Sequence, residues 1–222
     1  MSPLNTKRIQ LQTLPLFLGL TQKELDEISA ETCFSLKRMK VEEPIVMSGD
    51  MCDSINIVVS GKINIVSESA DHRYSMHEKI RAPWIIEPDK LFGIRQRYQS
   101  SYITETKCEI LTFQKSDVTS MMRRYLVFHL NYLNIVCRST QMAEILPWQQ
   151  KADNVRGRIV QFIRQHSRYP AGEKILRIKM RQLAHELNTS RLDVSIALNA
   201  MEQEEKIILK RGMIVIPAPE LL

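Results

Sequence analysis

The sequence predicts an α+β fold with an all-β unit first, then one long helix, then a small unit of helices closed by a hairpin. Three observations support this prediction. Short runs of β-branched and apolar residues recur between Phe34 and Phe113, apolar residues take helical spacing from about Ser116, and Pro147 ends that spacing. A chain of 222 residues is long enough for one large domain or two small ones.

Composition and charge indicate a globular protein with a basic C-terminal third. Apolar residues make up 44% of the chain and charged residues 25%, which excludes collagen-like and disordered classes. Residues 147–222 contain 13 Lys and Arg against 8 Asp and Glu. This bias predicts that the last third binds nucleic acid or another anionic surface. Because no uncharged run approaches the ~20 apolar residues of a membrane span, we expect a cytoplasmic protein with no membrane partner.

The first part of the chain begins with a short helix and continues as strands. Thr21 and Glu24 have the spacing of a capping box, which predicts a helix over 21–31. Ser60-Gly61 predicts a two-residue hairpin between the strands on either side of it. The predicted strands are 34–39, 44–47, 55–59, 62–66, 74–80 and 108–113. Many short strands separated by turns indicate a sandwich or a barrel.

One long helix is predicted over 116–146, with the Ser116 hydroxyl as its cap. Its apolar residues form two stripes. The first contains Phe128, Tyr132, Ile135, Met142 and Leu146, and the second contains Leu126, His129, Leu133, Val136, Thr140 and Ala143. Because a helix with two apolar faces needs two packing partners, we expect the first stripe to cover the β-unit and the second to pair with its copy in another subunit. Burial of both stripes within one domain is the alternative.

The chain after Pro147 is predicted to fold as a separate small unit. Residues 148–153 form a hinge that ends in an N-cap at Asp153. The predicted elements are a helix at 154–167, a strand at 175–178, helices at 180–187 and 190–204, and a hairpin over 207–216 that reverses at Arg211-Gly212. A very short turn joins the two central helices. This order is typical of a winged helix-turn-helix, whose second central helix enters the DNA major groove.

The helix that begins at Ser190 has the most informative pattern. Ser190 and Asp193 form a second capping box, and Val194, Leu198 and Met201 form a stripe that we expect to be buried. The opposite face is predicted to contact DNA.

On that face, Arg191 can donate to O6 and N7 of guanine, and Leu192 or Ile196 can contact a thymine methyl group. Polar and basic residues near the helix start and on the hairpin suit phosphates. The predicted DNA-binding residues are Arg181, Thr189, Ser190, Arg191, Leu192, Ser195, Ile196, Asn199, Lys210 and Arg211. A solvated face on a winged helix that binds a protein is the alternative.

Residues 178–207 resemble the helix-turn-helix of the Crp/Fnr family of bacterial transcription regulators. The strands around Gly49-Asp50 and Ser60-Gly61 resemble that family's cyclic-nucleotide-binding-like β-roll, a jelly-roll-like double-stranded β-helix, and the long helix resembles its dimerisation helix. The resemblance implies a homodimer that binds a pseudo-palindromic DNA operator, with RNA polymerase as a further partner. We therefore expect a β-roll sensor domain at 1–115, a dimerisation helix at 116–146 and a DNA-binding domain at 147–222.

The chain departs from the family pattern both in the helix that begins at Ser190 and in the effector region. Arg191 matches a frequent recognition arginine, but Leu192 and Ile196 replace the glutamate and second arginine that often follow, so we expect a different operator. In the effector region, Phe92-Gly93 is not followed by the acid that would hold a ribose. A second register uses Glu87 with Arg97, but it lacks the preceding glycine.

We therefore expect an effector other than a cyclic nucleotide. An acidic small molecule is our preferred class, and the effector-binding residues that we expect are Trp84, Gly93, Arg95, Arg97, Ser100 and Ser101. A solvated loop is the alternative for the arginines, and a protein without an effector is also possible.

The residues give less support to a metal site, a haem group or an enzyme activity. The four cysteines, Cys33, Cys52, Cys108 and Cys137, lack metal-ligand spacing, and none precedes residue 33, so we expect no metal site and no iron–sulfur cluster. A haem sensor is an alternative, with His72, His77, His129 or Cys52 as candidate axial ligands. No paired carboxylates, nucleophile–base pair or phosphate loop indicate an enzyme. The competing function is a cyclic-nucleotide-type sensor whose winged helix binds a protein.

Overall fold

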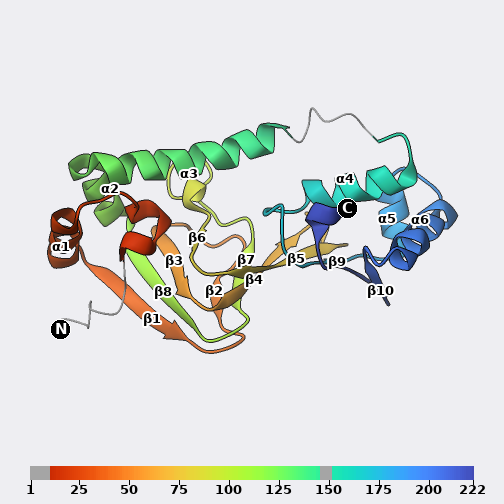
Figure 1. Cartoon of the computed structure of the whole chain (residues 1–222), viewed down its shortest axis with the longest axis horizontal. Helices are drawn as coiled ribbons and strands as arrows, with labels where there is room; N and C mark the ends of the chain where they lie inside the picture. Colours follow the sequence, from red (N-terminus) through yellow and green to blue (C-terminus); the bar gives the residue numbers. More distant parts are fainter. Residues whose placement is uncertain (1–10, 146–151) are drawn as a thin grey trace.

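The computed structural model describes the backbone of residues 11–145 and 152–222, and the side chains of 11–141 and 152–222. The predicted α+β class is confirmed. A strand-rich N-terminal part lies beneath a long helix, and a smaller C-terminal part of helices and strands lies at the other end of the molecule (Figure 1). Pro147 and residues 148–151 of the predicted hinge at 148–153 lie outside the described residues.

The strands form two antiparallel sheets, with the orders β1-β8-β3-β6 and β10-β11-β9-β5-β4-β7-β2. The strands are β1 Phe34–Met39, β2 Pro44–Val46, β3 Ser54–Ser60, β4 Lys62–Glu68, β5 Ser75–Arg81, β6 Trp84–Ile86, β7 Ser101–Thr104, β8 Cys108–Gln114, β9 Lys174–Arg177, β10 Ile208–Lys210 and β11 Met213–Ile216. All six strands predicted in the N-terminal part are present. The prediction omits β6 and β7, which are only three and four residues long.

The predicted hairpin at Ser60-Gly61 is wrong. β3 pairs with β6 and β8, whereas β4 pairs with β5 and β7, so the chain passes from one sheet to the other at this dipeptide. Gly61 has a φ of +97°, and a Cβ atom there would lie 2.5 Å from the carbonyl oxygen of Lys107. Because a hairpin and a corner between sheets can both require glycine with positive φ, the dipeptide cannot distinguish them.

The helices are α1 Gln22–Glu31, α2 Lys115–Arg124, α3 Leu126–Ile145, α4 Val155–Gln165, α5 Met180–Glu186 and α6 Arg191–Gln203. The predicted capping box at Thr21 and Glu24 forms at the start of α1. Asn154 rather than Asp153 caps α4, because the Asn154 side chain accepts a hydrogen bond from the Gly157 amide.

The prediction of one helix over 116–146 is also wrong. Tyr125 has extended dihedral angles, φ −119° and ψ 101°, and separates α2 from α3. Its ring is buried, and its hydroxyl donates to a Glu27 carboxylate oxygen in α1 at 3.4 Å. This tertiary contact interrupts a stretch whose apolar spacing is continuous. The cap of α2 is Gln114, not Ser116.

Buried apolar residues form two clusters. The larger cluster contains residues of the strand-rich part and the α3 residues Phe128 and Tyr132, so the first helical stripe covers the β-unit as predicted. Within it, the ring centroids of Phe17 and Phe128 lie 5.4 Å apart. The smaller cluster contains C-terminal residues together with Met76 of β5. Of the same stripe, Ile135 is partly buried against the larger cluster, and the side chains of Met142 and Leu146 lie outside the described part.

Candidate nucleic-acid interface and effector region

Helices α5 and α6 are joined by a tight turn at Asn188, whose φ is +48°. Ser190 begins α6 through a reciprocal cap with Asp193. The Ser190 hydroxyl accepts a hydrogen bond from the Asp193 amide at 3.1 Å and donates to the Asp193 carboxylate at 2.7 Å. This cap fixes the start of α6 and leaves its first turn at the surface.

The two faces of α6 differ sharply. The stripe predicted to be buried is confirmed, because Val194, Leu198 and Met201 are each 0% exposed. On the other face, Leu192 and Ile196 expose 68% and 60% of their surface. Arg191 and Asn199 are also exposed, and Ser195 is half-buried. A partner that covers this face would remove apolar surface from water at about 25 cal/mol per Å².

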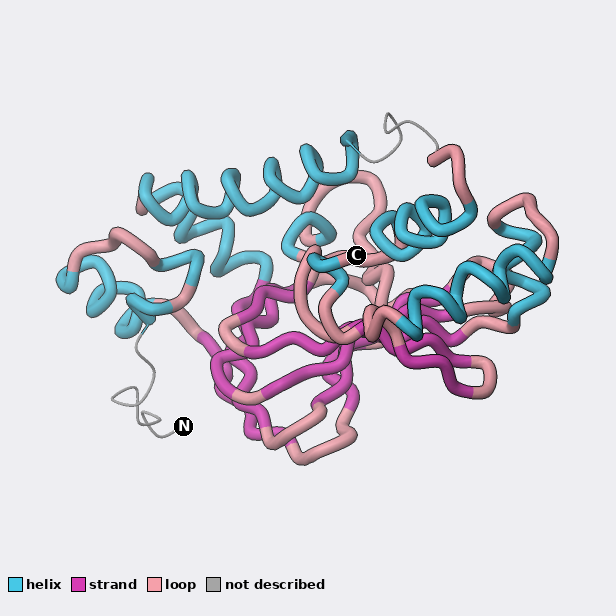
Figure 2. Tube along the Cα trace, turned by 45° about the vertical axis from the view of Figure 1, so that its right-hand side comes forward, coloured by secondary structure: helices cyan, strands magenta, loops and turns pink. Residues whose placement is uncertain are grey.

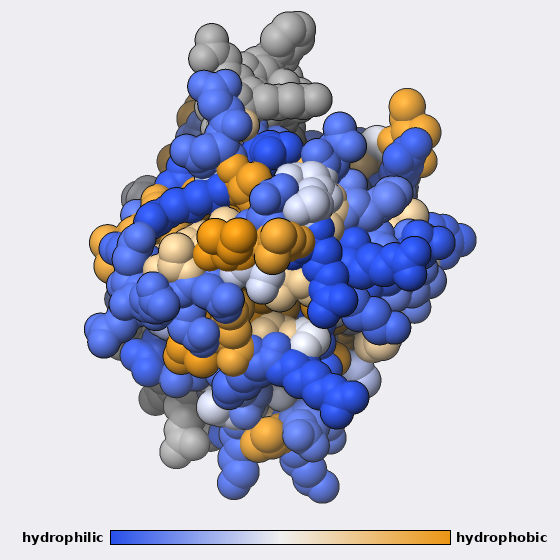
Figure 3. Space-filling view, turned by 90° about the vertical axis from the view of Figure 1, so that its right-hand side faces the viewer, coloured by the Kyte–Doolittle hydropathy of each residue, from blue (hydrophilic) through white to orange (hydrophobic). Residues whose placement is uncertain are grey.

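Four exposed basic side chains lie on α6, on the elements that contact it, or at the adjoining hairpin turn. Arg181 lies on α5, Arg191 on α6, and Lys210 and Arg211 at the end of the β10–β11 hairpin, and all four are exposed. Within the described part of the chain, none of them makes an ion pair. Figure 3 looks onto this end of the molecule, where hydrophilic side chains surround smaller hydrophobic patches. Thr189 is half-buried beside the cap.

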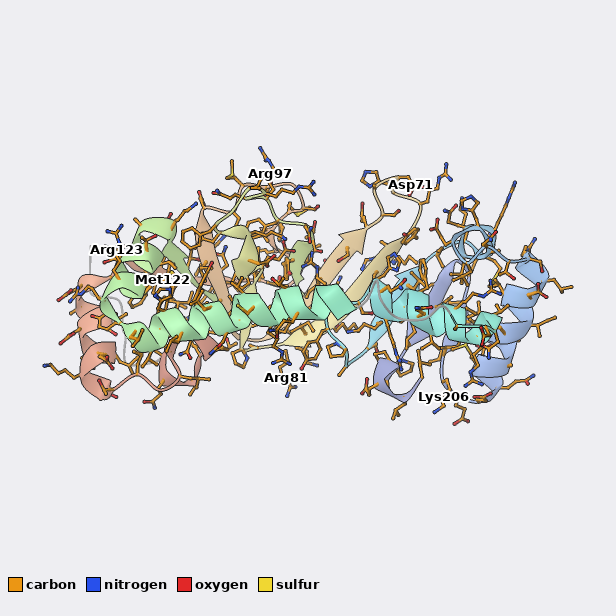
Figure 4. The ribbon with its side chains drawn as sticks, turned by 90° about the horizontal axis from the view of Figure 1, so that it is seen from above. Asp71, Arg81, Arg97, Met122, Arg123 and Lys206 are labelled. Carbon is orange, nitrogen blue, oxygen red and sulfur yellow. The ribbon has the colours of Figure 1, made fainter. Side chains whose placement is uncertain are left out.

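The six residues predicted to bind an effector do not converge on one site. Gly93 and Arg95 are exposed in the loop between β6 and β7. Arg97 is exposed and donates to the Gly49 carbonyl oxygen at 2.7 Å, and Figure 4 places it at the outer edge of the molecule. Ser100, in contrast, is 0% exposed.

The other two predicted residues have different surroundings. Ser101 is half-buried at the start of β7, and its hydroxyl accepts a hydrogen bond from the Ser48 amide at 3.0 Å. The Trp84 ring packs edge-on against Tyr169, with ring centroids 5.5 Å apart. The structure therefore brings Trp84 and Ser100 to the junction with the C-terminal part and leaves Arg95 and Arg97 at the surface.

Glu87 is the buried acid of this region. It is 4% exposed and has a φ of +35°. Its carboxylate accepts hydrogen bonds from the amides of Gln99 at 2.7 Å and Ser100 at 3.1 Å, and from the Tyr102 hydroxyl at 3.3 Å. Burial, together with the Glu87 charge, raises the pKa of Tyr102 well above its ordinary value, so this hydroxyl stays protonated. The buried Glu87 carboxylate thus holds the backbone of the loop between β6 and β7 in place by hydrogen bonds.

Arg168, which no sequence pattern indicates, lies against this acid. Its Nη2 is 3.1 Å from a Glu87 carboxylate oxygen and donates to the Gln99 side-chain oxygen at 3.0 Å. Its Nε donates to the Ser100 hydroxyl at 2.9 Å. Only 29% of the Arg168 side chain is exposed. No local pattern could have linked Arg168 to Glu87, because they lie in different parts of the chain.

The candidate haem ligands lie apart from one another. His72 is exposed near the tip of the β4–β5 hairpin, which Figure 4 locates by Asp71, and His77 is half-buried on β5. His129 is half-buried on α3, and Cys52 is 1% exposed. Burial raises the pKa of the Cys52 thiol. Among the described side chains, no three His, Cys, Asp or Glu residues are grouped as a metal site.

The second stripe of α3 is largely uncovered within one chain. Leu126 and Leu133 expose 70% and 42% of their surface, and Thr140 is also exposed. His129 and Val136 are half-buried, and Val136 packs against the larger core. The Ala143 side chain lies outside the described part.

The exposed face of α3 is turned slightly from the predicted stripe. Leu130 is 49% exposed and Cys137 is exposed, and both lie on the same side as Leu126 and Leu133. None of the described helices is both long enough and apolar enough to cross a bilayer.

Comparisons with known proteins identify relatives of both parts of the chain. Residues 36–125 match the family model of the cyclic nucleotide-binding domain. The chain is 24% identical to the cyclic AMP receptor protein of Thermus thermophilus over 213 residues, which are 94% of each protein. The crystal structure of the Thermus thermophilus catabolite activator protein has a TM-score of 0.53 at 21% identity and covers 93% of this chain and 95% of its own. That structure supports the fold described above.

A more distant structural match is FixK2 of Bradyrhizobium japonicum, with a TM-score of 0.48 at 12% identity over 85% of this chain and 95% of its own. The c-di-GMP responsive global regulator CLP of Xanthomonas campestris has the same TM-score at 17% identity, over 88% of this chain and 99% of its own.

Proposed function

We propose that the chain is a transcription regulator of the Crp/Fnr type, a homodimer that binds DNA sequence-specifically and whose β-roll senses an effector other than a cyclic nucleotide. In this proposal residues 1–115 form the sensor domain, 116–146 the dimerisation segment and 147–222 the DNA-binding domain. A winged helix that binds a protein is the competing function.

The exposed face of α6 is the observation that carries the proposal. Arg191 stands at its first turn with no ion-pair partner among the described residues, beside the exposed Leu192 and Ile196. A forked guanidinium suits a guanine edge, and exposed apolar side chains suit thymine methyl groups. Lys210 and Arg211 at the hairpin end would then contact phosphates, which position the domain without reading sequence.

The uncovered stripe of α3 supports the homodimer. A second copy of this stripe would cover Leu126, Leu130 and Leu133 by coiled-coil packing. Residues 147–222 carry 13 Lys and Arg against 8 Asp and Glu, a net charge of +5 per chain. Dimerisation therefore doubles the positive charge that faces one duplex, which strengthens attraction to phosphates.

The contacts of Glu87 and Ser100 support an effector other than a cyclic nucleotide. Both residues already hydrogen-bond within the chain, and the Arg168 guanidinium contacts both of them. Trp84 packs against Tyr169, next to Arg168 in the chain, whereas the Ser101 hydroxyl accepts from the Ser48 amide. Arg95 and Arg97 are exposed and would need a change in the loop to reach this region.

Salt-dependent binding to a random-sequence duplex tests the DNA-binding proposal. We expect the affinity to fall by one or more orders of magnitude between ~50 and ~200 mM salt, because phosphate contacts release counterions. Arg211→Ala should weaken binding to all sequences alike and lower the slope of log affinity against log salt by about 1. Arg38→Ala is the control, since this exposed arginine of β1 pairs with Glu109 of β8 in the N-terminal part. Salt-independent or absent binding would favour the protein-binding alternative.

Selection of bound sequences from a random DNA pool, with and without cell extract, completes the test. A homodimer should select a pseudo-palindrome with half-sites about one helical turn apart. A change in recovered affinity on adding extract would report an effector. Recovery of no consensus would contradict sequence-specific recognition.

A further inference from the structure

Strands β5 and β9 join the N-terminal and C-terminal parts in one continuous sheet. Their register runs from Ser75 opposite Arg177 to Glu78 opposite Lys174. Figure 2 shows the strands running from one part into the other without a break. Met76 of β5 is 2% exposed and packs within the C-terminal core. Contacts with the β-roll therefore fix the orientation of the C-terminal part.

A buried ion pair stands at the end of this ladder. Lys174 Nζ lies 2.8 Å from a Glu78 carboxylate oxygen, and both side chains are 0% exposed. The Glu78 carboxylate also accepts hydrogen bonds from the amides of Arg168 at 2.9 Å and Tyr169 at 3.0 Å. Lys174 donates to the Ala171 carbonyl oxygen at 2.9 Å. These hydrogen bonds offset the desolvation of the two charges and hold the backbone of residues 168–171 in place.

The fixed backbone directs the Arg168 side chain into the loop between β6 and β7, residues 87–100, which we call the effector loop. The Arg168 guanidinium contacts Glu87, Gln99 and Ser100, three residues of the β-roll. Through this guanidinium, a side chain of the C-terminal part contacts the buried Glu87 carboxylate. A carboxylate that is 1% exposed needs a positive or donating partner, and Arg168 provides one. The C-terminal domain thus supplies a part of the sensor's own polar interior.

We propose that Arg168 is an internal occupant of the effector loop and acts as a latch between the two domains. Any molecule that uses the Glu87 carboxylate and the Ser100 hydroxyl must displace the guanidinium, and its displacement loosens the attachment of β9 to β5. Occupation of the sensor and orientation of the winged helix are thereby coupled through one side chain. The latch itself is independent of the proposed function, which enters only through the assumption that this loop receives an effector.

Hydrogen exchange of the full-length protein tests the latch without DNA or effector. We expect Arg168→Ala to speed exchange of the amides in β5 and β9 by about tenfold or more, as the loss of charge-assisted hydrogen bonds implies. Exchange in the β1–β8 pair should not change. Arg164→Ala is the matched control, because the hydrogen bond of Arg164 to the Leu222 carbonyl oxygen stays within the C-terminal part. Unaltered exchange in Arg168→Ala would overturn the proposal.

A second variant shows whether the effect passes through the loop. Gln99→Ala removes the side-chain oxygen that accepts from Arg168 Nη2, and we expect it to speed exchange in β5 and β9 in the wild type but to add nothing in the Arg168→Ala background. An equal increase in both backgrounds would show that Gln99 and Arg168 act independently and would refute the latch. If amide exchange in β1 and β8 increased as much as in β5 and β9, the effect would be general destabilisation, and this result would also refute the latch.

Discussion

Arg191 is the residue on which base recognition depends most in the proposed function. It is exposed at the first turn of α6, and the Ser190 cap fixes the backbone that precedes it. We expect Arg191→Ala to weaken binding to the selected operator by ~1–3 kcal/mol and to relax the preference at one base pair per half-site. Competition binding and a repeated selection measure the two effects. Arg164→Ala should change neither, and an unaltered affinity and consensus in Arg191→Ala would show that another residue reads the base.

His77 makes the stability of the protein depend on pH. Burial lowers the pKa of His77, and the positive charge of Arg177 on the neighbouring β9 lowers it further. In the unfolded chain the pKa of a histidine is about 6.5. At any pH between this value and the lowered pKa of the folded state, the unfolded chain therefore binds more protons than the folded chain. Stability is lost across this window and is retained above it.

Thermal unfolding of His77→Gln measures this contribution. We expect the wild-type Tm to fall more than that of the variant between about pH 7 and about pH 5.5, the range around the ordinary His pKa. His72→Gln is the control, because His72 is exposed near the tip of the same hairpin. Parallel Tm profiles for His77→Gln and the wild type would contradict the assignment.

At the scale of elements, α3 carries the proposed dimer contact. Leu126, Leu130 and Leu133 together form an exposed apolar stripe, and burying one such side chain contributes about 1.5–3 kcal/mol. We expect Leu133→Glu to convert a dimer at micromolar concentration into a monomer, as measured by light scattering. Arg138→Glu introduces a glutamate at an exposed position on another side of α3 and should leave the dimer intact. A monomeric wild type would exclude this interface.

The elements that the sequence predicts well are those with local signals. The caps at Thr21 and Ser190 place the starts of α1 and α6 correctly, since a capping hydrogen bond involves residues only three apart. The break at Tyr125 was not predictable, because it accompanies a contact with Glu27 of a distant helix. Gly61 gave the right conformation and the wrong topology, because strand pairing depends on residues far along the chain.

At the scale of the whole molecule, the site was less predictable than the fold. The sequence favours Arg95 and Arg97 as effector-binding residues because they are near Ser100 in the chain, yet Arg97 donates to the Gly49 carbonyl oxygen at the surface. The arginine beside Ser100 is Arg168, which the β5–β9 ladder and the Glu78–Lys174 pair bring there. Contacts between domains leave no periodic pattern in a single sequence, so only the assembled structure reveals them.

The latch predicts that DNA affinity depends on a residue remote from the DNA. Two recognition helices must lie about 34 Å apart to enter successive major grooves, and a C-terminal part that shares a sheet with the β-roll cannot adjust freely to that spacing. We therefore expect Arg168→Ala, without effector, to bind the selected operator up to about tenfold more tightly than the wild type, because apparent affinity rises with the fraction of binding-competent molecules. Anisotropy titrations of Arg168→Ala, Arg164→Ala and the wild type measure this. Weaker binding by Arg168→Ala would mean that DNA selects the latched orientation, and an effector that displaces Arg168 would then release the protein from DNA.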